Sequence, residues 1–204
     1  MTRITKSKEE RRQEIIDTAL QLFLSKGYEK TAVSDIVRAV DVAQGTFYYY
    51  FKSKTDVLEA VVEHYIKALA QEVRRIARKR NIDPPKRLNK IINYLSQLHD
   101  INEEIYEVLH QESNITLHYK LGMKTTVLLL PVFAEVIEEG IKSGSFDVKY
   151  PAETALLLLV TVSTLMHDMN ITGDKDHKKR LRISTEDSVE RILSVKNYKF
   201  KLKL

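Results

Sequence analysis

Residues 31–50 read TAVSDIVRAVDVAQGTFYYY, and this stretch decides the fold. Apolar side chains recur every three or four residues over 33–40, which predicts a short helix with Thr31 as its N-cap. A brief break at Asp41–Val42 precedes a second short helix over about 43–51. Two short helices joined by such a turn form the helix-turn-helix pattern, whose second helix enters the major groove of DNA.

The second helix of this pattern carries Tyr48, Tyr49 and Tyr50 in succession. Three consecutive residues spread over most of the circumference of a helix, so at least one ring must face water or a partner. Phe47 and Phe51 lie four residues apart and mark the inner face. The aromatic side chains could also simply fill a small three-helix core, and the pattern alone leaves both interpretations open.

The start of the same helix has residue types that suit a DNA groove. Gln44 can donate to and accept from an adenine edge, and the Thr46 hydroxyl suits a base or a phosphate. Gly45 has no side chain, so DNA could approach the backbone closely. The groups expected to reach phosphate oxygens are the hydroxyls of Tyr49 and Tyr50 and the ammonium groups of Lys52 and Lys54.

Helical periodicity continues along the chain and no period-2 alternation is sustained, so the fold is predicted to be all-α. A helix over 9–25 ends at Gly27, and a capping box of Ser53 and Asp56 starts a long helix. Pro131 is expected to kink or break the helix that contains it. The other helices are predicted over about 84–99, 102–118, 121–143, 151–170 and 184–196, and a frayed end is favoured over a short strand for the basic tail at 196–204.

Charge is unevenly distributed. Residues 1–54 hold ten Lys/Arg and seven Asp/Glu, residues 55–174 hold thirteen and seventeen, and residues 175–204 hold ten and four. A basic first segment beside an acidic middle fits contact of part of the chain with a polyanion, although a solvated surface could give the same pattern. Cysteine is absent, which excludes disulfides and thiolate chemistry. No signal peptide is expected, and the longest apolar run, at 155–166, is too short to span a bilayer.

Residues 27–61, GYEKTAVSDIVRAVDVAQGTFYYYFKSKTDVLEAV, resemble the N-terminal signature of tetracycline-repressor-like (TetR family) transcription regulators. The features that carry the resemblance are T-x-V-x-D-I, G-T-x-Y-x-Y-F and K-S-K-x-D-x-L at fixed spacing, and it is specific over about 9–66. A weaker likeness to the late helices of the family follows in PVFAEVIEEGIKSGSFD at 131–147 and PAETALLLL at 151–159.

Two positions depart from the family pattern. Asp41 stands in the turn where the family usually has Gly, and Asp tolerates a left-handed backbone better than most residues. Ala43 stands where the recognition helix usually begins with Ser or Thr, and the loss of an N-cap oxygen costs roughly 0.5–2 kcal/mol. The start of the recognition helix is therefore expected to be less rigid before DNA binds.

The resemblance implies an N-terminal three-helix helix-turn-helix DNA-binding domain over 1–54. A long fourth helix would join it to a helical ligand-binding and dimerisation domain over 55–204, with about nine helices in all. It also implies a cytoplasmic, sequence-specific regulator, in most members a repressor that binds a palindromic operator in double-stranded DNA and is released by a small molecule.

Carried over residue by residue, the resemblance assigns base reading to Gln44 and Thr46 and phosphate contacts to Tyr49, Tyr50 and Lys54. Tyr48 is the position that could instead pack inward against the first helix. An N-terminal arm with Arg3, Lys6, Lys8, Arg11 and Arg12 could add non-specific phosphate contacts or could be a solvated end. The expected DNA-contacting residues are Thr31, Ser34, Gln44, Gly45, Thr46, Tyr48, Tyr49, Tyr50, Lys52 and Lys54.

Members of the family are homodimers through their last two helices, which correspond here to 151–170 and 184–196. Leu156–Val160 is too apolar to be left bare on a monomer. Helices four to eight would enclose a largely apolar small-molecule effector, although apolar residues at helical spacing can simply be core. The candidate lining residues are Tyr94, Leu98, Tyr106, Leu109, His110, Met123, Val127 and Met166.

Other classes of function find less support. The six histidines show no H-E-x-x-H or similar metal spacing, and there is no Gly-rich phosphate loop or nucleophile elbow, so neither an all-α enzyme nor a metal or cofactor is expected. A DNA-binding regulator or architectural protein without a small-molecule ligand remains an open alternative. Membrane contact through the basic stretch RRIARKR at 74–80 is a third, weaker one.

Overall fold

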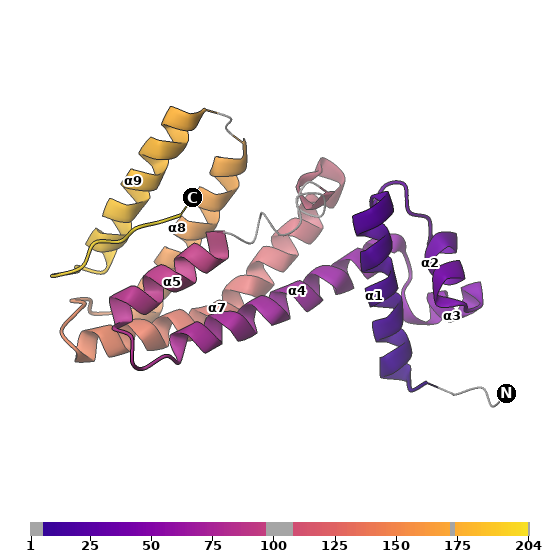
Figure 1. Ribbon diagram of the computed structural model, residues 1–204, viewed down its shortest axis with the longest axis horizontal. Coiled ribbons are helices and arrows are strands. Elements are labelled where there is room, and N and C mark those ends of the chain that lie inside the picture. The colour runs from indigo at the N-terminus through magenta and orange to yellow at the C-terminus, as the bar shows by residue number, and fades with distance from the viewer. Residues whose placement is uncertain (1–5, 97–107, 172–173, 204) are drawn as a thin grey trace. The chain divides into compact units, whose positions relative to one another are not determined.

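The computed structural model describes residues 6–96, 108–171 and 174–203, apart from the side chains at 113 and 165–171. The described chain is all-helical, as the sequence predicted (Figure 1). The α-helices are α1 (Lys8–Lys26), α2 (Val33–Val40), α3 (Gln44–Tyr50), α4 (Lys54–Ala77), α5 (Pro84–Ser96), α7 (Ile115–Lys142), α8 (Pro151–Ile171) and α9 (Lys175–Ile192), and the 3₁₀ helix η2 spans Glu112–Asn114.

The chain forms two compact units. The first unit comprises residues 1–68 and 102–121, and the second unit comprises 69–101 and 122–204. Helices α4 and α7 contribute residues to both. Because each unit has its own buried side chains, each is described by itself.

The first unit is built on α1 to α3 and the first part of α4. Helix α1 begins with a capping box, in which the Glu10 N–H donates to Ser7 Oγ at 3.1 Å and the Ser7 N–H donates to Glu10 Oε2 at 2.7 Å. It ends at Gly27, whose φ of +94° few other residues tolerate. The buried side chains of this unit include Ile15, Ile16, Ala19, Phe23, Ile36, Val40, Phe47, Phe51, Val57, Leu58 and Val61.

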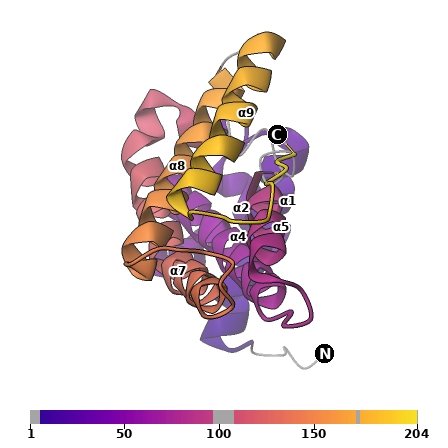
Figure 2. The same cartoon turned by 90° about the vertical axis from the view of Figure 1, so that its left-hand side faces the viewer.

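The second unit has the larger core. It gathers apolar side chains from the end of α4, from α5, α7, α8 and α9, and from the C-terminal tail. Helices α8 and α9 lie side by side in both views (Figures 1 and 2). The ring of Phe146 lies directly over Gly140, where a Cβ would collide with it, so the turn after α7 depends on glycine. Arg87 is buried and pairs with Glu139, while it donates to the Ala77 carbonyl oxygen at 2.6 Å.

Several predicted boundaries were wrong. Helix α7 contains Pro131, as predicted, and does not break there, which was one of the two effects expected of this proline, because the packing of a 28-residue helix offsets the one backbone bond that it removes. Its start at Ile115 lies inside the predicted 102–118 helix, of which residues 108–110 are helical and 102–107 lie outside the described residues. Helix α9 starts at Lys175 rather than 184, because Asp174 caps it by accepting the Asp176 N–H at 2.9 Å.

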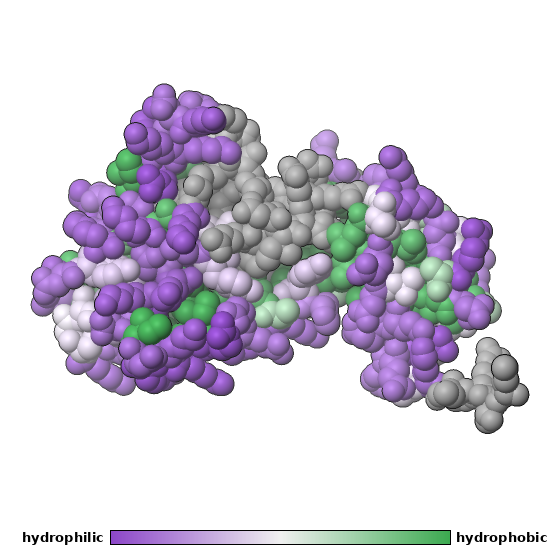
Figure 3. Space-filling model, in the orientation of Figure 1, coloured by the Kyte–Doolittle hydropathy of each residue, from purple (hydrophilic) through white to green (hydrophobic). Residues whose placement is uncertain are grey.

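Among the helices that the structure describes, none combines the length and the apolar character needed to cross a lipid bilayer. The surface of the second unit on the face seen in Figure 3 is largely hydrophilic.

Candidate nucleic-acid interface

The turn between α2 and α3 is tight and internally bonded. Asp41 has φ +56° and ψ +55°, the left-handed conformation that the sequence predicted for it. Its N–H donates to the Arg38 carbonyl oxygen at 3.2 Å, and the Val42 N–H donates to that of Val37 at 3.2 Å. Aspartate therefore replaces glycine in this turn without loss of the helix-ending hydrogen bonds.

The start of α2 differs from the prediction. The N-cap is Ala32 and not Thr31, and the Ala32 N–H donates to Asp35 Oδ2 at 2.9 Å. The same carboxylate pairs with Lys26 at the end of α1. The hydrogen bond from Lys26, followed by that from the Ala32 N–H, lowers the pKa of Asp35. Asp35 thus links the ends of two helices of the first unit.

Thr31 belongs to the interior. Its side chain is only 1% exposed, and its hydroxyl donates to the Gly27 carbonyl oxygen at 2.6 Å. Its own N–H donates to Tyr28 O at 3.1 Å. Both donors of Thr31 are used inside the protein. The prediction that Thr31 contacts DNA is therefore replaced by a structural role, in which it fixes the α1–α2 loop.

Helix α3 starts without a side-chain cap. Ala43 occupies the N-cap, and the Thr46 N–H donates only to the Ala43 carbonyl oxygen, at 2.8 Å. The prediction of a missing N-cap oxygen is therefore confirmed. The first N–H groups of α3 are left for an external acceptor.

Helix α3 has one buried face and one bare face. Phe47 and Phe51 are buried, as predicted from their spacing, and their ring centroids lie 6.0 Å apart. Tyr48 and Tyr49 are exposed, and Tyr50 is half-buried with its ring 4.9 Å edge-on from that of Tyr49. Two tyrosines therefore face outward. The other candidates around the bare face are Ser34, Gln44, Gly45 and Lys52, which are exposed, and Thr46, which is half-buried.

Gly45 has no structural reason to be glycine. A Cβ built on it would meet no atom within 4 Å, and its φ is not positive. A glycine inside a helix costs roughly 0.5–1 kcal/mol relative to alanine. The residue is therefore unfavourable for the isolated protein, and any benefit of it must come from a surface that approaches from outside.

The first helix contacts the exposed tyrosine. Lys8 Nζ lies 5.5 Å from the centroid of the Tyr49 ring, and the hydrogen bond to Tyr49 raises the pKa of Lys8. Arg12 lies over the Phe51 ring at 5.1 Å. The start of α1 thus places two cations beside α3, which the sequence suggested only as a general basic arm. Of that arm, Arg3 lies outside the described residues, and Lys6 and Arg11 both pair with Glu14.

Lys54 is already engaged inside the first unit. Its Nζ donates to the Tyr28 carbonyl oxygen at 2.8 Å and to that of Glu29 at 3.4 Å, and it lies 4.2 Å from the Tyr28 ring centroid. Half of the predicted capping box next to Lys54 is present, because the Asp56 N–H donates to Ser53 Oγ at 3.1 Å, while the Asp56 carboxylate accepts from the Lys52 N–H at 2.9 Å. The sequence did not predict that Lys54 binds the α1–α2 loop, since nothing local links Lys54 to a loop 25 residues earlier.

The described residues that were predicted to line an effector site do not lie around one common pocket. Tyr94 lines an open groove of about 500 Å³ together with Tyr198, Asn93 and Lys90. Met123 and Val127 are exposed on α7. Leu109 and His110 are half-buried, and the His110 and His118 rings lie 4.2 Å apart. Leu98, Tyr106 and the Met166 side chain lie outside what the structure describes. Within the described residues, no group of three or more His, Asp or Glu could hold a metal ion.

Two family models match the chain and together span more than half of it. The family described as bacterial regulatory proteins, tetR family, matches residues 15–61. The one described as tetracyclin repressor-like, C-terminal domain, matches residues 97–187. The first match covers the described helix-turn-helix.

Characterised and uncharacterised regulators are similar over most of the chain. The transcriptional repressor KstR2 of Rhodococcus jostii is 28% identical over 76% of this chain and 77% of its own length. The fatty acid metabolism regulator protein of Bacillus subtilis is 25% identical over 93% of this chain and 97% of its own. An uncharacterised HTH-type regulator of Bacillus subtilis, YerO, is 27% identical over 81% of this chain, which spans 58% of that protein.

Solved structures share the fold. A TetR-family transcriptional regulator from Pectobacterium atrosepticum has a TM-score of 0.74 at 18% identity, over 92% of this chain and 98% of that one. The regulator FadR from Bacillus subtilis, in complex with stearoyl-CoA, has a TM-score of 0.61 at 22% identity, over 89% and 97%.

Proposed function

This chain belongs to the tetR family of bacterial regulatory proteins, and from that premise we propose that it is a repressor that binds a palindromic operator as a dimer. In this proposal a small-molecule effector releases it from DNA. The proteins of similar sequence named above are transcription regulators and not enzymes.

The bare face of α3 is the observation that carries the proposal. The seven-residue helix and its C-cap bury Phe47 and Phe51, while the helix leaves Gln44, Gly45 and Tyr49 uncovered, and Tyr49 is 63% exposed. Gln44 and Gly45 lie in the first turn, where recognition helices meet base edges. The uncapped N–H groups of that turn would suit a phosphate oxygen.

The contacts with DNA divide into base reading and phosphate anchoring. Gln44 and Thr46 would read bases, and Tyr49, Tyr50 and Lys52 would bind phosphates, with Ser34 beside them on α2. Tyr48 is exposed, and no described contact packs it against α1. It would therefore also bind a phosphate. The main role of Lys54 would be indirect, because its ammonium group holds the α1–α2 loop in place.

The proposed dimer forms through α8 and α9. Leu156, Leu157 and Val160 are exposed on α8, and Ile183 is exposed on α9. A two-fold interface would cover this apolar surface, and a palindromic operator then requires that the two α3 helices reach half-sites about 34–36 Å apart, one helical turn of DNA.

The proposed effector is largely apolar. Because the regulator of Bacillus subtilis that aligns with nearly the whole chain is named for fatty acid metabolism, a long-chain fatty acyl compound is the first class to test. The effector must bind more tightly to a conformation whose two α3 helices are wrongly spaced for DNA. By reciprocal linkage, operator DNA must weaken effector binding by the same factor.

Selection of bound genomic DNA fragments at two salt concentrations tests the proposal. A palindromic consensus with a steep salt dependence is expected, since phosphate contacts release counterions. A lone subunit that binds no duplex fragment would overturn it. Repeating the selection with Gln44→Ala should relax base preference at one or two positions per half-site, whereas Lys52→Ala should weaken all sequences about equally. A uniform loss in both variants would contradict the division into reading and anchoring residues.

A further inference from the structure

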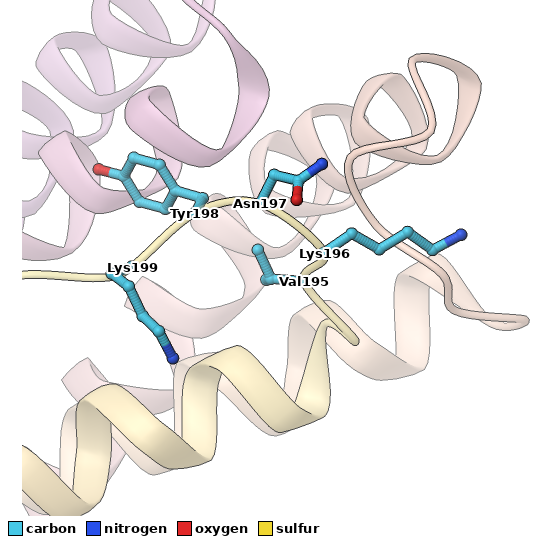
Figure 4. A pocket seen from close by; sticks show the side chains of 5 residues that line it. All are labelled: Val195, Lys196, Asn197, Tyr198 and Lys199. Atoms are coloured by element: carbon cyan, nitrogen blue, oxygen red, sulfur yellow. The ribbon is translucent and has the colours of Figure 1, made fainter.

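The chain after α9 turns back and lies along the second unit. Ser194 adopts φ +47°, and the Asp147 N–H donates to the Leu193 carbonyl oxygen at 3.2 Å. Residues 195–199 line a cavity of about 240 Å³ (Figure 4), with the Lys199 side chain turned toward α9 and that of Tyr198 away from it. From there an extended segment, residues 198–203, runs between α5 and α9, as Figures 1 and 2 show.

Side chains of α5 and α9 bind the main chain of this segment. Its four consecutive N–H groups donate alternately to the two helices, at 2.7–2.9 Å. The acceptors are Glu190 for Phe200, Asn89 for Lys201, Glu186 for Leu202 and Asn93 for Lys203.

The carbonyl oxygens of the segment are bound as well. That of Lys201 accepts from Asn89 Nδ2 and from Asn93 Nδ2, both at 2.9 Å, and that of Lys203 accepts from Ser96 Oγ at 2.9 Å. The Asn89 amide therefore pairs with both polar groups of Lys201, as a neighbouring β-strand would. The main chain is recognised on both sides without a sheet.

The helical spacing explains this fit. Asn89 and Asn93 are four residues apart on α5, and Glu186 and Glu190 are four apart on α9. Four helical residues rise about 6 Å, and two extended residues rise about 6.6–6.8 Å. Each helix can therefore serve every second N–H of an extended chain.

Two apolar side chains fix the register. Phe200 and Leu202 are fully or almost fully buried in the core of the second unit, while the Lys199 and Lys201 side chains lie outside. A slip by one residue would put lysines into the core. Asn89 and Glu186 are themselves buried, and without the segment their polar groups would lose these partners.

We propose that α5 and α9 form a peptide-binding groove and that residues 198–203 are its ligand in cis. The groove takes an extended peptide in which apolar residues alternate with lysines, and it reads the main chain of that peptide through the amides of α5 and the carboxylates of α9. The segment detaches and rebinds as one unit, and when bound it holds α9 against α5.

Hydrogen exchange of the full-length protein tests the unit behaviour. The amides of Phe200 to Lys203 should be protected and should exchange with one common opening rate, although they lie at the end of the chain. The variant Phe200→Ala/Leu202→Ala keeps every N–H but should lose protection at all four, while Lys201→Gln should keep it. Unprotected amides in the wild type, or four unrelated rates, would overturn the proposal.

Binding in trans tests the groove itself. A fluorescent peptide NYKFKLKL, the sequence of residues 197–204, should bind the full-length Phe200→Ala/Leu202→Ala variant roughly tenfold or more tightly than the wild type, whose groove is occupied. The peptide NYKKKFLL has the same composition without the alternation of apolar residues and lysines, and it should bind neither protein. Equal binding of both peptides, or equal binding to both proteins, would show charge attraction alone and would sink the proposal. As a control, circular dichroism of the variant checks that it is folded.

Discussion

Individual residues of the helix-turn-helix have two kinds of role, which their surroundings separate. Asp41 and Thr31 serve the fold, the first through a left-handed backbone and the second through a buried hydroxyl. Gly45 serves neither packing nor backbone geometry within this chain. At a residue such as Gly45, which the fold does not require, a change should alter DNA binding without a loss of stability.

Gly45→Ala is the sharpest test of that separation. The substitution should leave the free energy of unfolding unchanged or raise it by up to about 1 kcal/mol, because alanine favours the helix and meets no atom. It should weaken operator binding, because the added methyl group occupies the space that DNA would approach. Urea unfolding and fluorescence anisotropy with operator DNA measure the two effects.

Gly122→Ala provides the matched control for that test. Gly122 also lies in a helix, with no atom within 4 Å of a built Cβ, but on α7. It should show the same effect on stability and none on DNA affinity. If Gly45→Ala bound operator DNA as well as the wild type, close approach of DNA at this position would be wrong.

Lys54→Met should lower the free energy of unfolding by roughly 1.5–3 kcal/mol, the range for hydrogen bonds to charged groups. The change keeps the aliphatic stem but removes the bonds to Tyr28 O and Glu29 O. Lys52→Met at the neighbouring exposed position should stay within about 0.5 kcal/mol. Equal stability of the two variants in urea would show that the ammonium group of Lys54 does not hold the loop.

At the scale of elements, sequence predicts what short-range chemistry determines. The α2–turn–α3 pattern, the buried Phe47/Phe51 face and the Ser53 cap follow from spacing within a few residues, and all are present. The bound C-terminal tail could not be predicted, because Lys201 meets Asn89 across 112 positions of sequence. A basic, polar-looking end was expected to fray, and the acceptors that prevent this lie on distant helices.

The junction of α1 and α2 should depend on pH through Asp35. The hydrogen bonds from Lys26 and Ala32 hold the folded-state pKa of Asp35 below that of the unfolded chain. Its stabilising contribution is therefore present above the unfolded value of about 3.9 and is lost as pH falls through the lowered folded pKa. Asp35→Asn should remove this contribution at neutral pH, and the difference from the wild type should shrink in acid.

Urea unfolding at neutral pH and at about pH 3 measures that difference for each protein. Asp41→Asn is the control, because asparagine tolerates the same left-handed backbone. A stability difference between Asp35→Asn and the wild type that stayed constant over this pH range would contradict the linkage.

For the whole molecule, the proposed binding to a palindrome depends on the uncovered side of α8, through which we expect two copies of the chain to pair. Leu157 and Val160 are 59% and 54% exposed on a helix whose opposite side is buried in the second unit. Apolar side chains clustered in this way are typical of a surface that a partner covers. We propose that this partner is a second copy of the chain.

Leu157→Glu/Val160→Glu should therefore give a folded monomer, because the substitutions put charge on the exposed side of α8 and leave the buried Leu158 and Leu159 in place. Loss of the dimer removes the bivalent hold on two half-sites, so affinity for the full palindrome should fall roughly 10²-fold or more. Binding of a single half-site should change little, since α3 is untouched. Sedimentation velocity and anisotropy measure both effects, with Glu153→Gln on the same exposed side as control. A double variant that stayed dimeric would place the subunit interface elsewhere, whereas a monomer that kept full palindrome affinity would show that dimerisation is not what selects the operator.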